Sequence, residues 1–196
     1  MRYSGDHKAK TRERVLREAA RELRAKGRDN VSVARVMERA GLTHGGFYAH
    51  FSSKDDLVAE AVATMFDDAR ARLAATTDDE PRRALRAYID FYLSAAHRDN
   101  RERGCPLPAL SGDLARADPA ARERFGAGVK GLSDRLAQLL RAIGSAAPDA
   151  EASAMLAQMV GAVALSRAVA DSAQSDAILA DARADLVARY NLETAQ

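Results

Sequence analysis

The residues best suited to chemistry stand together between positions 43 and 54, where the chain reads THGGFYAHFSSK. Threonine, histidine, tyrosine and lysine side chains donate hydrogen bonds to the edges of bases and to phosphate oxygens. The spacing provides no nucleophile with a neighbouring base, no phosphate-binding loop and no set of metal ligands. We therefore expect a contact with nucleic acid here, and we expect no enzyme, no bound metal and no cofactor.

The elements around this stretch are predicted to form a helix-turn-helix. Ser32 is placed to cap a short helix that ends at a turn around Gly41. Thr43 is placed to cap a second, very short helix that ends near Ala49, with Phe47 as a buried anchor. In this motif the second helix enters the major groove. Its outward face carries small or hydrogen-bonding residues: Thr43, His44, Gly45, Gly46 and Tyr48.

Contacts with phosphate are expected directly after that helix. Tyr48, His50 and Lys54 follow where the DNA backbone would lie. Ser53, with Asp56 three residues further on, resembles a capping box and is predicted to start a long helix. Lys54 stands in the first turn of that helix, where free backbone N–H groups also favour a phosphate.

The whole chain is predicted to be helical. It is rich in alanine, leucine, arginine and glutamate, and its five prolines all lie after residue 80. Sustained strand alternation is missing from the sequence. Gly27 is expected to end the first helix, and Asp118 to cap the seventh. The nine predicted helices cover about residues 8–26, 32–40, 43–49, 53–75, 81–97, 108–115, 118–143, 149–171 and 176–190.

Charge divides the chain into two unequal parts. The net charge is only +2, but the first 55 residues hold 13 Lys and Arg against 7 Asp and Glu. The remainder holds 17 basic and 21 acidic residues. A basic quarter joined to a mildly acidic body suggests one end for a polyanion and another for a different partner. Alternatively, the basic run from Lys8 to Arg28 is a solvated face that is partly offset by its own glutamates.

The segment GLTHGGFYAHFSSKDDLVAEAV resembles the signature of the TetR family of bacterial transcriptional regulators. The resemblance covers residues 15–62, about a quarter of the chain. The matching positions are Gly41, Leu42, Phe47, Tyr48, His50, Phe51, Lys54 and Leu57. The pair Gly45–Gly46 departs from the pattern, because many members carry larger residues there. The DNA contacts that the resemblance implies are Ser32, Thr43, His44, Gly45, Tyr48, His50 and Lys54.

The resemblance also implies an overall plan. It implies an all-α homodimer with a helix-turn-helix domain at residues 1–53 and an effector-binding and dimerisation domain at residues 54–196. The last two long helices are expected to form the dimer interface. The implied function is a ligand-responsive regulator, and we expect a repressor that a small, largely apolar effector releases from a palindromic DNA operator.

The effector pocket is expected among aromatic and sulfur-containing residues of the C-terminal helices. An alternative is that these residues simply form the core, and the two methionines have the further alternative of packing in the dimer seam. His97 is expected on the surface at the end of the fifth helix. The candidate lining residues are Tyr88, Phe91, Tyr92, Phe125, Met155 and Met159.

Cys105 is the single cysteine and supports a second functional hypothesis. A redox or electrophile sensor is one interpretation, because nearby arginines at 98, 101 and 103 are expected to lower the thiol pKa. A buried, inert cysteine is the alternative.

The expected compartment is the cytoplasm, in association with the nucleoid. A lone cysteine suits a reducing compartment, and the first residues contain no apolar stretch typical of a signal peptide. The most apolar segment, residues 155–170, is too short and too polar to span a membrane. A helical interaction module without DNA binding is a third functional hypothesis, and the complete set of Tyr48, His50 and Lys54 argues against it.

Overall fold

The computed structural model describes residues 2–75 and 80–193, with side chains from residue 7 onward. Within these ranges the chain contains α-helices and 3-10 helices but no strand, which confirms the all-α prediction. The N-terminal elements are α1 (Arg2–Lys26), α2 (Val33–Arg39), the 3-10 helix η1 (His44–Ala49) and α3 (Lys54–Ala75). The C-terminal elements are α4 (Pro81–Tyr92), α5 (Ala95–Asp99), η2 (Arg101–Arg103), α6 (Pro106–Leu114), α7 (Pro119–Ala142), α8 (Pro148–Ala168) and α9 (Ser172–Arg189).

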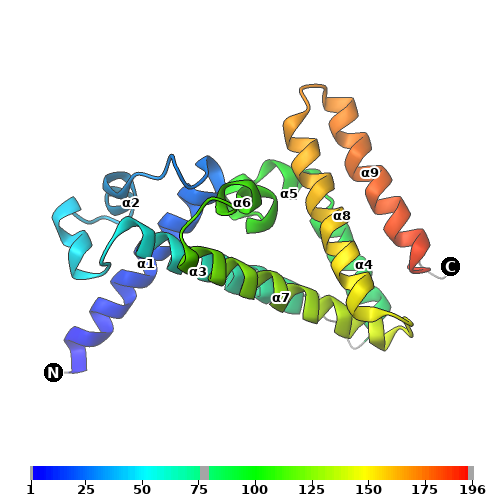
Figure 1. The fold of residues 1–196 in the computed structure, drawn as a ribbon, viewed down its shortest axis with the longest axis horizontal. Helices are drawn as coiled ribbons and strands as arrows, with labels where there is room; N and C mark the ends of the chain where they lie inside the picture. Colours follow the sequence, from blue (N-terminus) through cyan, green and yellow to red (C-terminus); the bar gives the residue numbers. More distant parts are fainter. Residues whose placement is uncertain (1, 76–79, 194–196) are drawn as a thin grey trace.

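The molecule is elongated, with its two ends built from different parts of the chain (Figure 1). The N-terminal head consists of α1, α2 and η1, and α8 and α9 lie at the opposite end (Figure 1). Helices α3 and α7 run side by side between the ends, and α3 packs against both α1 and α7. Helix α3 therefore links the head to the C-terminal part through its packing against both. No described helix is long and apolar enough to cross a membrane.

The turn between α2 and η1 depends on a glycine. Gly41 has a φ of +69°, in the left-handed region that residues with a Cβ rarely adopt. Its N–H donates to the Glu38 carbonyl at 2.9 Å, and the N–H of Leu42 donates to the Met37 carbonyl at 2.9 Å. These two bonds form a Schellman motif, which ends α2 and turns the chain sharply into η1.

The start of α3 follows the predicted capping box with one change. Ser53 accepts a hydrogen bond from the Asp56 N–H at 3.0 Å, as expected for the cap. The Asp56 carboxylate reaches back to the N–H and the hydroxyl of Ser52, both at 2.9 Å, and so bonds one residue earlier than the box requires. The first turn of α3 is therefore held from both sides.

Three local predictions are wrong. The third helix is a 3-10 helix, and the Thr43 side chain makes no capping bond. Two glycines within six residues lower helix propensity, which explains why no regular α-helical turn forms. The predicted helix over residues 81–97 breaks after Tyr92, because Ser94 caps a new helix by accepting from the His97 N–H at 3.1 Å. His97 is buried, with an exposed fraction of 4%, and does not lie on the surface.

The two long helices α3 and α7 approach closely at Gly128. A Cβ at this position would lie 2.2 Å from the Phe66 ring, so the position admits no larger residue without movement. The Phe66 ring, which is 1% exposed, also meets Phe125 edge to face with centroids 5.5 Å apart. The region where α3 and α7 cross is therefore packed around one aromatic ring.

Candidate nucleic-acid interface and effector domain

The outer face of η1 is polar and exposed, and its inner face is aromatic and buried. Phe47 and Phe51 are each 2% exposed and stack with centroids 5.6 Å apart, which anchors η1 to the head. Tyr48 is 72% exposed, with its ring edge against Phe47 at a centroid distance of 5.2 Å. Thr43, His44 and Gly45 are also exposed. The predicted inward and outward faces of this element are confirmed, except that Gly46 is half-buried.

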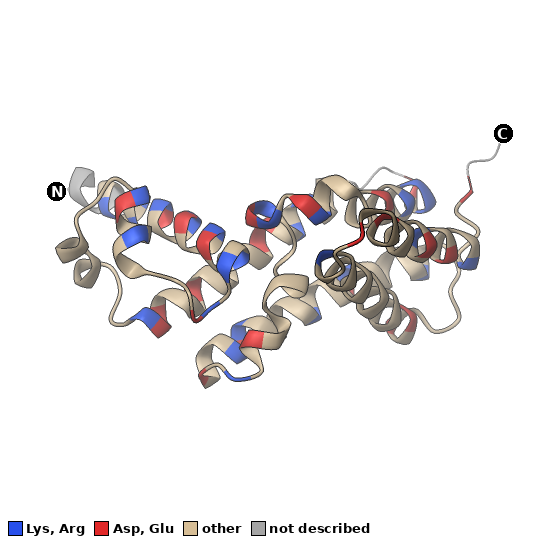
Figure 2. Ribbon diagram, turned by 90° about the horizontal axis from the view of Figure 1, so that it is seen from above, with Lys and Arg blue, Asp and Glu red and all other residues tan. Residues whose placement is uncertain are grey.

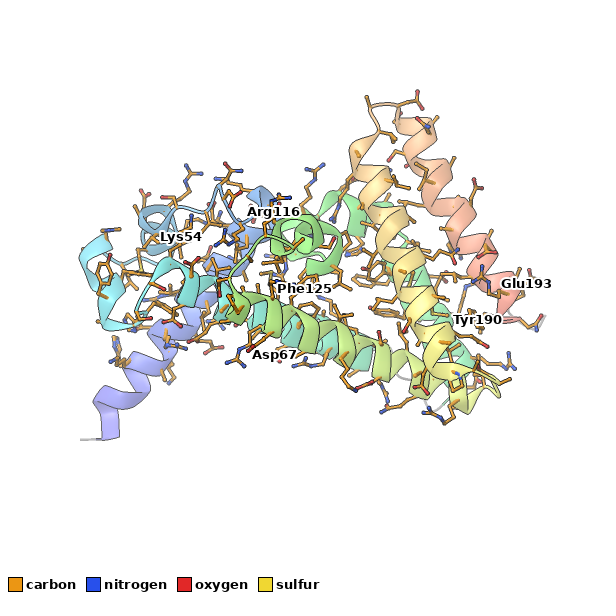
Figure 3. All side chains as sticks on the ribbon, viewed as in Figure 1. Lys54, Asp67, Arg116, Phe125, Tyr190 and Glu193 are labelled. Carbon is orange, nitrogen blue, oxygen red and sulfur yellow. The ribbon has the colours of Figure 1, made fainter. Side chains whose placement is uncertain are left out.

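Two further candidate residues lie at helix N-termini beside η1. Ser32 precedes α2 and accepts from the Arg35 N–H at 3.4 Å, so its hydroxyl proton stays free to donate. Lys54 is the exposed first residue of α3 and lies at the same end of the molecule as the head (Figure 3). Both positions combine a polar side chain with the N–H groups of a helix start, an arrangement that suits phosphate.

His50 lies at the end of η1 in a half-buried position. Its Nδ1 is buried and has no hydrogen-bond partner among the described residues. Burial, followed by the nearby charges of Lys8 and Arg12, lowers the pKa of His50, so the ring is neutral at pH 7. Arg12 also donates to the His50 carbonyl at 3.4 Å and lies 4.8 Å above the Phe51 ring. Arg12 therefore fixes the end of η1 against α1.

The basic run of α1 is partly neutralised by its own glutamates. Figure 2 shows blue and red bands together along this helix. The ion pairs within the helix are Arg17–Glu13 at 2.7 Å, Arg21–Glu18 at 2.6 Å and Lys26–Glu22 at 3.1 Å. Arg24 is 5% exposed and hydrogen-bonds within the protein, so it does not contribute to the surface. The count of 13 basic against 7 acidic residues already includes these glutamates, and the burial of Arg24 lowers the excess available to a polyanion by one more charge.

The head is tied to the C-terminal part by polar contacts that sequence reasoning missed. The Asp113 carboxylate of α6 accepts from the Arg28 N–H at 3.0 Å, directly after α1. A Cβ on Gly27, whose φ is +77°, would lie 2.4 Å from the same carboxylate. In η2, Glu102 pairs with Arg39 of α2 at 3.5 Å. The two residues of each pair are more than 60 positions apart in the sequence, so no local pattern predicts the contact.

The predicted effector residues do not meet in one cavity. Tyr88, Tyr92, Met155 and Met159 have exposed fractions of 0–2% and belong to the packed core. The methionines are thus buried within one protomer, and their predicted alternative in the dimer seam is wrong. Among five cavities of the described residues, Phe91 lines one, Phe125 lines another, and the other four line none of the five.

His97 joins α4 to the segment before α6 through both ring nitrogens. Nε2 accepts from the Cys105 N–H at 2.9 Å, so the proton sits on Nδ1, which donates to the Tyr92 carbonyl at 2.6 Å. Burial lowers the pKa of His97 to about 4, and the charges of Arg167 and Arg72 act in the same direction. The neutral imidazole is therefore part of the fold's hydrogen bonding.

Cys105 lies next to this histidine and is 5% exposed. Burial raises the pKa of its thiol above the ordinary value, which corrects the expectation of a lowered one. The arginines that act against burial are Arg24 and Arg72, and not the three that are adjacent in sequence.

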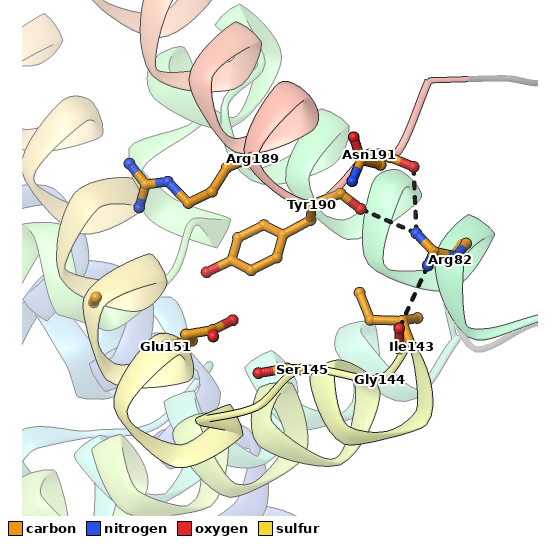
Figure 4. A pocket seen from close by; sticks show the side chains of 9 residues that line it. Arg82, Ile143, Gly144, Ser145, Glu151, Arg189, Tyr190 and Asn191 are labelled. Carbon is orange, nitrogen blue, oxygen red and sulfur yellow. Dashed lines mark hydrogen bonds between the residues drawn. The ribbon is translucent and has the colours of Figure 1, made fainter.

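A cavity of about 410 Å³ lies where α7 and α9 end (Figure 4). Arg82 closes one side by donating to the carbonyls of Tyr190 at 3.0 Å, Asn191 at 3.3 Å and Ile143 at 3.4 Å. These carbonyls belong to the ends of α7 and α9, where helix carbonyls lack partners within the helix. Arg82 therefore has a clear structural role as a cap for two helix ends.

Two family models match this chain. The model "Bacterial regulatory proteins, tetR family" matches residues 15–61, which contain the second half of α1, α2, η1 and the start of α3. The model "Transcriptional regulator LmrA/YxaF-like, C-terminal domain" matches residues 81–181, more than half of the chain. The chain belongs to the TetR family of bacterial transcriptional regulators. The helix-turn-helix of this TetR-family protein is thus a DNA-binding element, and the protein is a transcription regulator and not an enzyme.

Several solved structures share the fold of this chain. A regulator from Chloroflexus aurantiacus is 25% identical, with a TM-score of 0.80 over 95% of this chain and 96% of its own. The reduced form of E. coli NemR is 20% identical, with a TM-score of 0.79 over 91% of this chain and 97% of its own. A regulator from Agrobacterium tumefaciens is 24% identical, with a TM-score of 0.76 over 91% and 98%. A comparison with curated protein sequences gives no match.

Proposed function

We propose that this TetR-family protein is a homodimeric repressor that binds a near-palindromic DNA operator in the cytoplasm and is released by a small-molecule effector. One observation carries the proposal. Tyr48 is 72% exposed, although Phe47 and Phe51, which precede and follow it in the sequence, are both buried. A large aromatic residue held outward on a firmly anchored element serves a partner, since the fold itself does not use it.

The proposal assigns two kinds of DNA contact to the head. Thr43, His44 and Gly45 face the base edges in the major groove. A Cβ on Gly45 would meet nothing within 4 Å, so the absence of a side chain there serves the approach of the backbone to DNA and not the packing of the head. Phosphate contacts are assigned to Ser32, Tyr48, His50 and Lys54. Because the His50 ring is neutral at pH 7, it contributes a hydrogen bond and no charge.

Support for the dimer comes from the outer surfaces of α8 and α9. Leu165 is 60% exposed and stands in a stripe of small residues that recurs every three or four positions. The stripe on α8 consists of Ala154, Ala157, Gly161, Leu165 and Ala168, and that on α9 of Ala173, Ala177, Ala180, Ala184 and Ala188. Small side chains let helices approach closely, so two copies of this hairpin suit a four-helix interface.

A DNA-binding assay on variants tests the assignment. Binding to DNA from upstream of the protein's own gene is measured by fluorescence anisotropy over a range of salt concentrations. Tyr48→Ala and Lys54→Ala should weaken binding to all sequences, and Lys54→Ala should lower the salt slope by about 1. His44→Ala should change the preferred base at one position, by about 1–3 kcal/mol.

The matched control is Lys130→Ala, which removes another exposed lysine, from α7, far along the chain from the head. It should leave both affinity and salt slope unchanged. If Lys54→Ala and Lys130→Ala behave alike, the phosphate contact at the start of α3 is wrong. If His44→Ala weakens all sequences equally, His44 does not contact bases.

Redox or electrophile sensing through Cys105 has less support. The solved structure of NemR is of a reduced form, so the thiol hypothesis is worth testing in this chain. The Cys105 side chain, however, is 5% exposed and burial raises its pKa, and both features oppose a reactive thiolate. We therefore propose a non-covalent effector, whose coupling to DNA binding need only be about 1–3 kcal/mol.

A further inference from the structure

A cavity of about 410 Å³ opens where α4, α5 and η2 meet the end of α3. Its lining combines an aromatic ring, two arginines and a buried histidine, contributed by four different elements. The residues that carry the argument are Arg72, Phe91, His97, Arg103 and Gly104. The cavity does not overlap the packed core around Tyr88 and Met155.

One wall of the cavity is aromatic. Phe91 is 38% exposed, although it is a large apolar residue on a helix whose inner face is buried. Its ring lies over the His97 ring, with centroids 5.3 Å apart and planes inclined by 31°. Both nitrogens of His97 are engaged by backbone groups, so the part of this residue that lines the cavity is neutral. A flat apolar body suits this wall.

The other wall is cationic and not neutralised. Among the described residues, no acidic side chain forms an ion pair with Arg72 or Arg103, and Arg72 donates only to the Arg103 carbonyl. The acids of this segment are already engaged, because Asp99 pairs with Arg98 at 2.8 Å and Glu102 pairs with the head. Two guanidinium groups at one opening therefore have no counter-charge from the described residues, and an anionic ligand would supply one.

The same segment contacts the DNA-binding head. Helix η2 packs against α1, and Glu102 reaches Arg39 of α2 at 3.5 Å. The Glu102 carbonyl also accepts from Arg24 of α1 at 3.4 Å. Gly104 is confined, since a Cβ there would lie 3.1 Å from Arg167 and 3.2 Å from His97. Arg103 belongs to η2, which lies between the cavity and the head. A ligand that attracts Arg103 would therefore pull on η2 and so change its contacts with the head.

We propose that this cavity is the effector site and that its ligand is an organic anion with a flat apolar body, such as an aromatic carboxylate or sulfonate. The apolar body lies against Phe91 and His97, and the acid group lies between Arg72 and Arg103. This inference rests on the proposed function, because it names the ligand class for the proposed effector response.

Two fluorescent probes of nearly equal shape test the charge requirement. The anion 8-anilinonaphthalene-1-sulfonate and the neutral N-phenyl-1-naphthylamine are titrated into the full chain without DNA. The sulfonate should bind one site per protomer, at least about tenfold more tightly than the neutral amine. Arg72→Gln and Arg103→Gln should each weaken sulfonate binding by about tenfold and leave the amine unchanged.

The matched control is Arg116→Gln, which removes an exposed arginine that follows α6 and lines none of the five cavities (Figure 3). It should leave both titrations unchanged. Equal affinities for the two probes, or equal effects of Arg103→Gln and Arg116→Gln, would overturn the assignment. Operator binding is measured separately without a probe, so a failure to bind DNA would contradict the proposed function and leave the cavity result standing.

Discussion

Protonation of His97 is expected to destabilise the fold in mild acid. The side chain is 4% exposed, and its unprotonated Nε2 accepts from the Cys105 N–H at 2.9 Å. A proton on Nε2 would break this bond and place a positive charge near Arg167 and Arg72. Burial in the first place, and then these two charges, set the pKa of His97 to about 4, below the ordinary 6.5.

The size of the effect follows from this difference in pKa. Between pH 6.5 and pH 4 the unfolded chain binds the proton and the folded chain does not, so stability falls as the pH falls. The contribution is complete above pH 6.5 and is lost as the pH falls through about 4. The full loss is about 3 kcal/mol, because one pKa unit equals about 1.4 kcal/mol. From pH 7 to pH 5 the expected loss is about 2 kcal/mol.

Urea unfolding of the wild type and of His97→Gln, each at pH 7 and at pH 5, isolates this contribution. Glutamine keeps a donor and an acceptor but does not titrate, and all other titrating groups are common to both proteins. The wild type should lose about 2 kcal/mol more than the variant between the two pH values. Parallel losses in the two proteins would refute the reasoning, and so would an NMR titration in which the His97 ring protonates near pH 6.5.

Other predictions concern packing, the head contact and the thiol. Gly128→Ala presses a methyl group into the Phe66 ring and should lower the free energy of unfolding by about 1–3 kcal/mol, whereas Gly126→Ala, with nothing within 4 Å, should raise it by up to about 1 kcal/mol. Equal effects of the two substitutions would contradict the close approach of α3 and α7. Asp113→Ala leaves the backbone N–H after α1 without its acceptor and should cost about 1–3 kcal/mol in urea unfolding; an unchanged midpoint would show that this contact contributes nothing. Cys105 should react with an aromatic disulfide reagent only after unfolding, and complete labelling of the native protein would restore the thiol-sensor hypothesis.

The DNA-binding element could be predicted because its signals are local. Gly41, Phe47 and Phe51 each act on residues within one helical turn, so turn, anchor and outward face follow from spacing alone. The helix type of η1 escaped the prediction, since the balance between α and 3-10 geometry in a six-residue element is small. The break at Ser94 was missed because the spacing of apolar residues continues past it without interruption. The Ser94 hydroxyl nevertheless accepts from the His97 N–H and so starts a new helix.

The proposed effector site could be predicted only in part: Phe91 was among the expected lining residues, but the other residues are brought together by the fold from distant positions. Tyr88 and Phe91 are three residues apart on one helix, yet one is 2% exposed and the other 38%. The sequence shows that both residues are aromatic, but it does not show which face of the helix the neighbouring helices cover. The cationic wall needs Arg72 from α3 and Arg103 from η2, a pair that no spacing rule connects.

Selection of random duplex DNA by the purified protein, followed by sequencing, tests whether η1 recognises a specific operator. Recognition by a homodimer through η1 predicts enrichment of an inverted repeat whose half-site centres lie about 34–36 Å apart, or a multiple of that spacing, as a two-fold symmetric dimer requires. It further predicts that His44→Ala alters the enriched bases and that Lys54→Ala lowers the yield without altering them. A pool without any enriched sequence, or the same bases enriched by His44→Ala, would contradict specific DNA recognition through the face of η1.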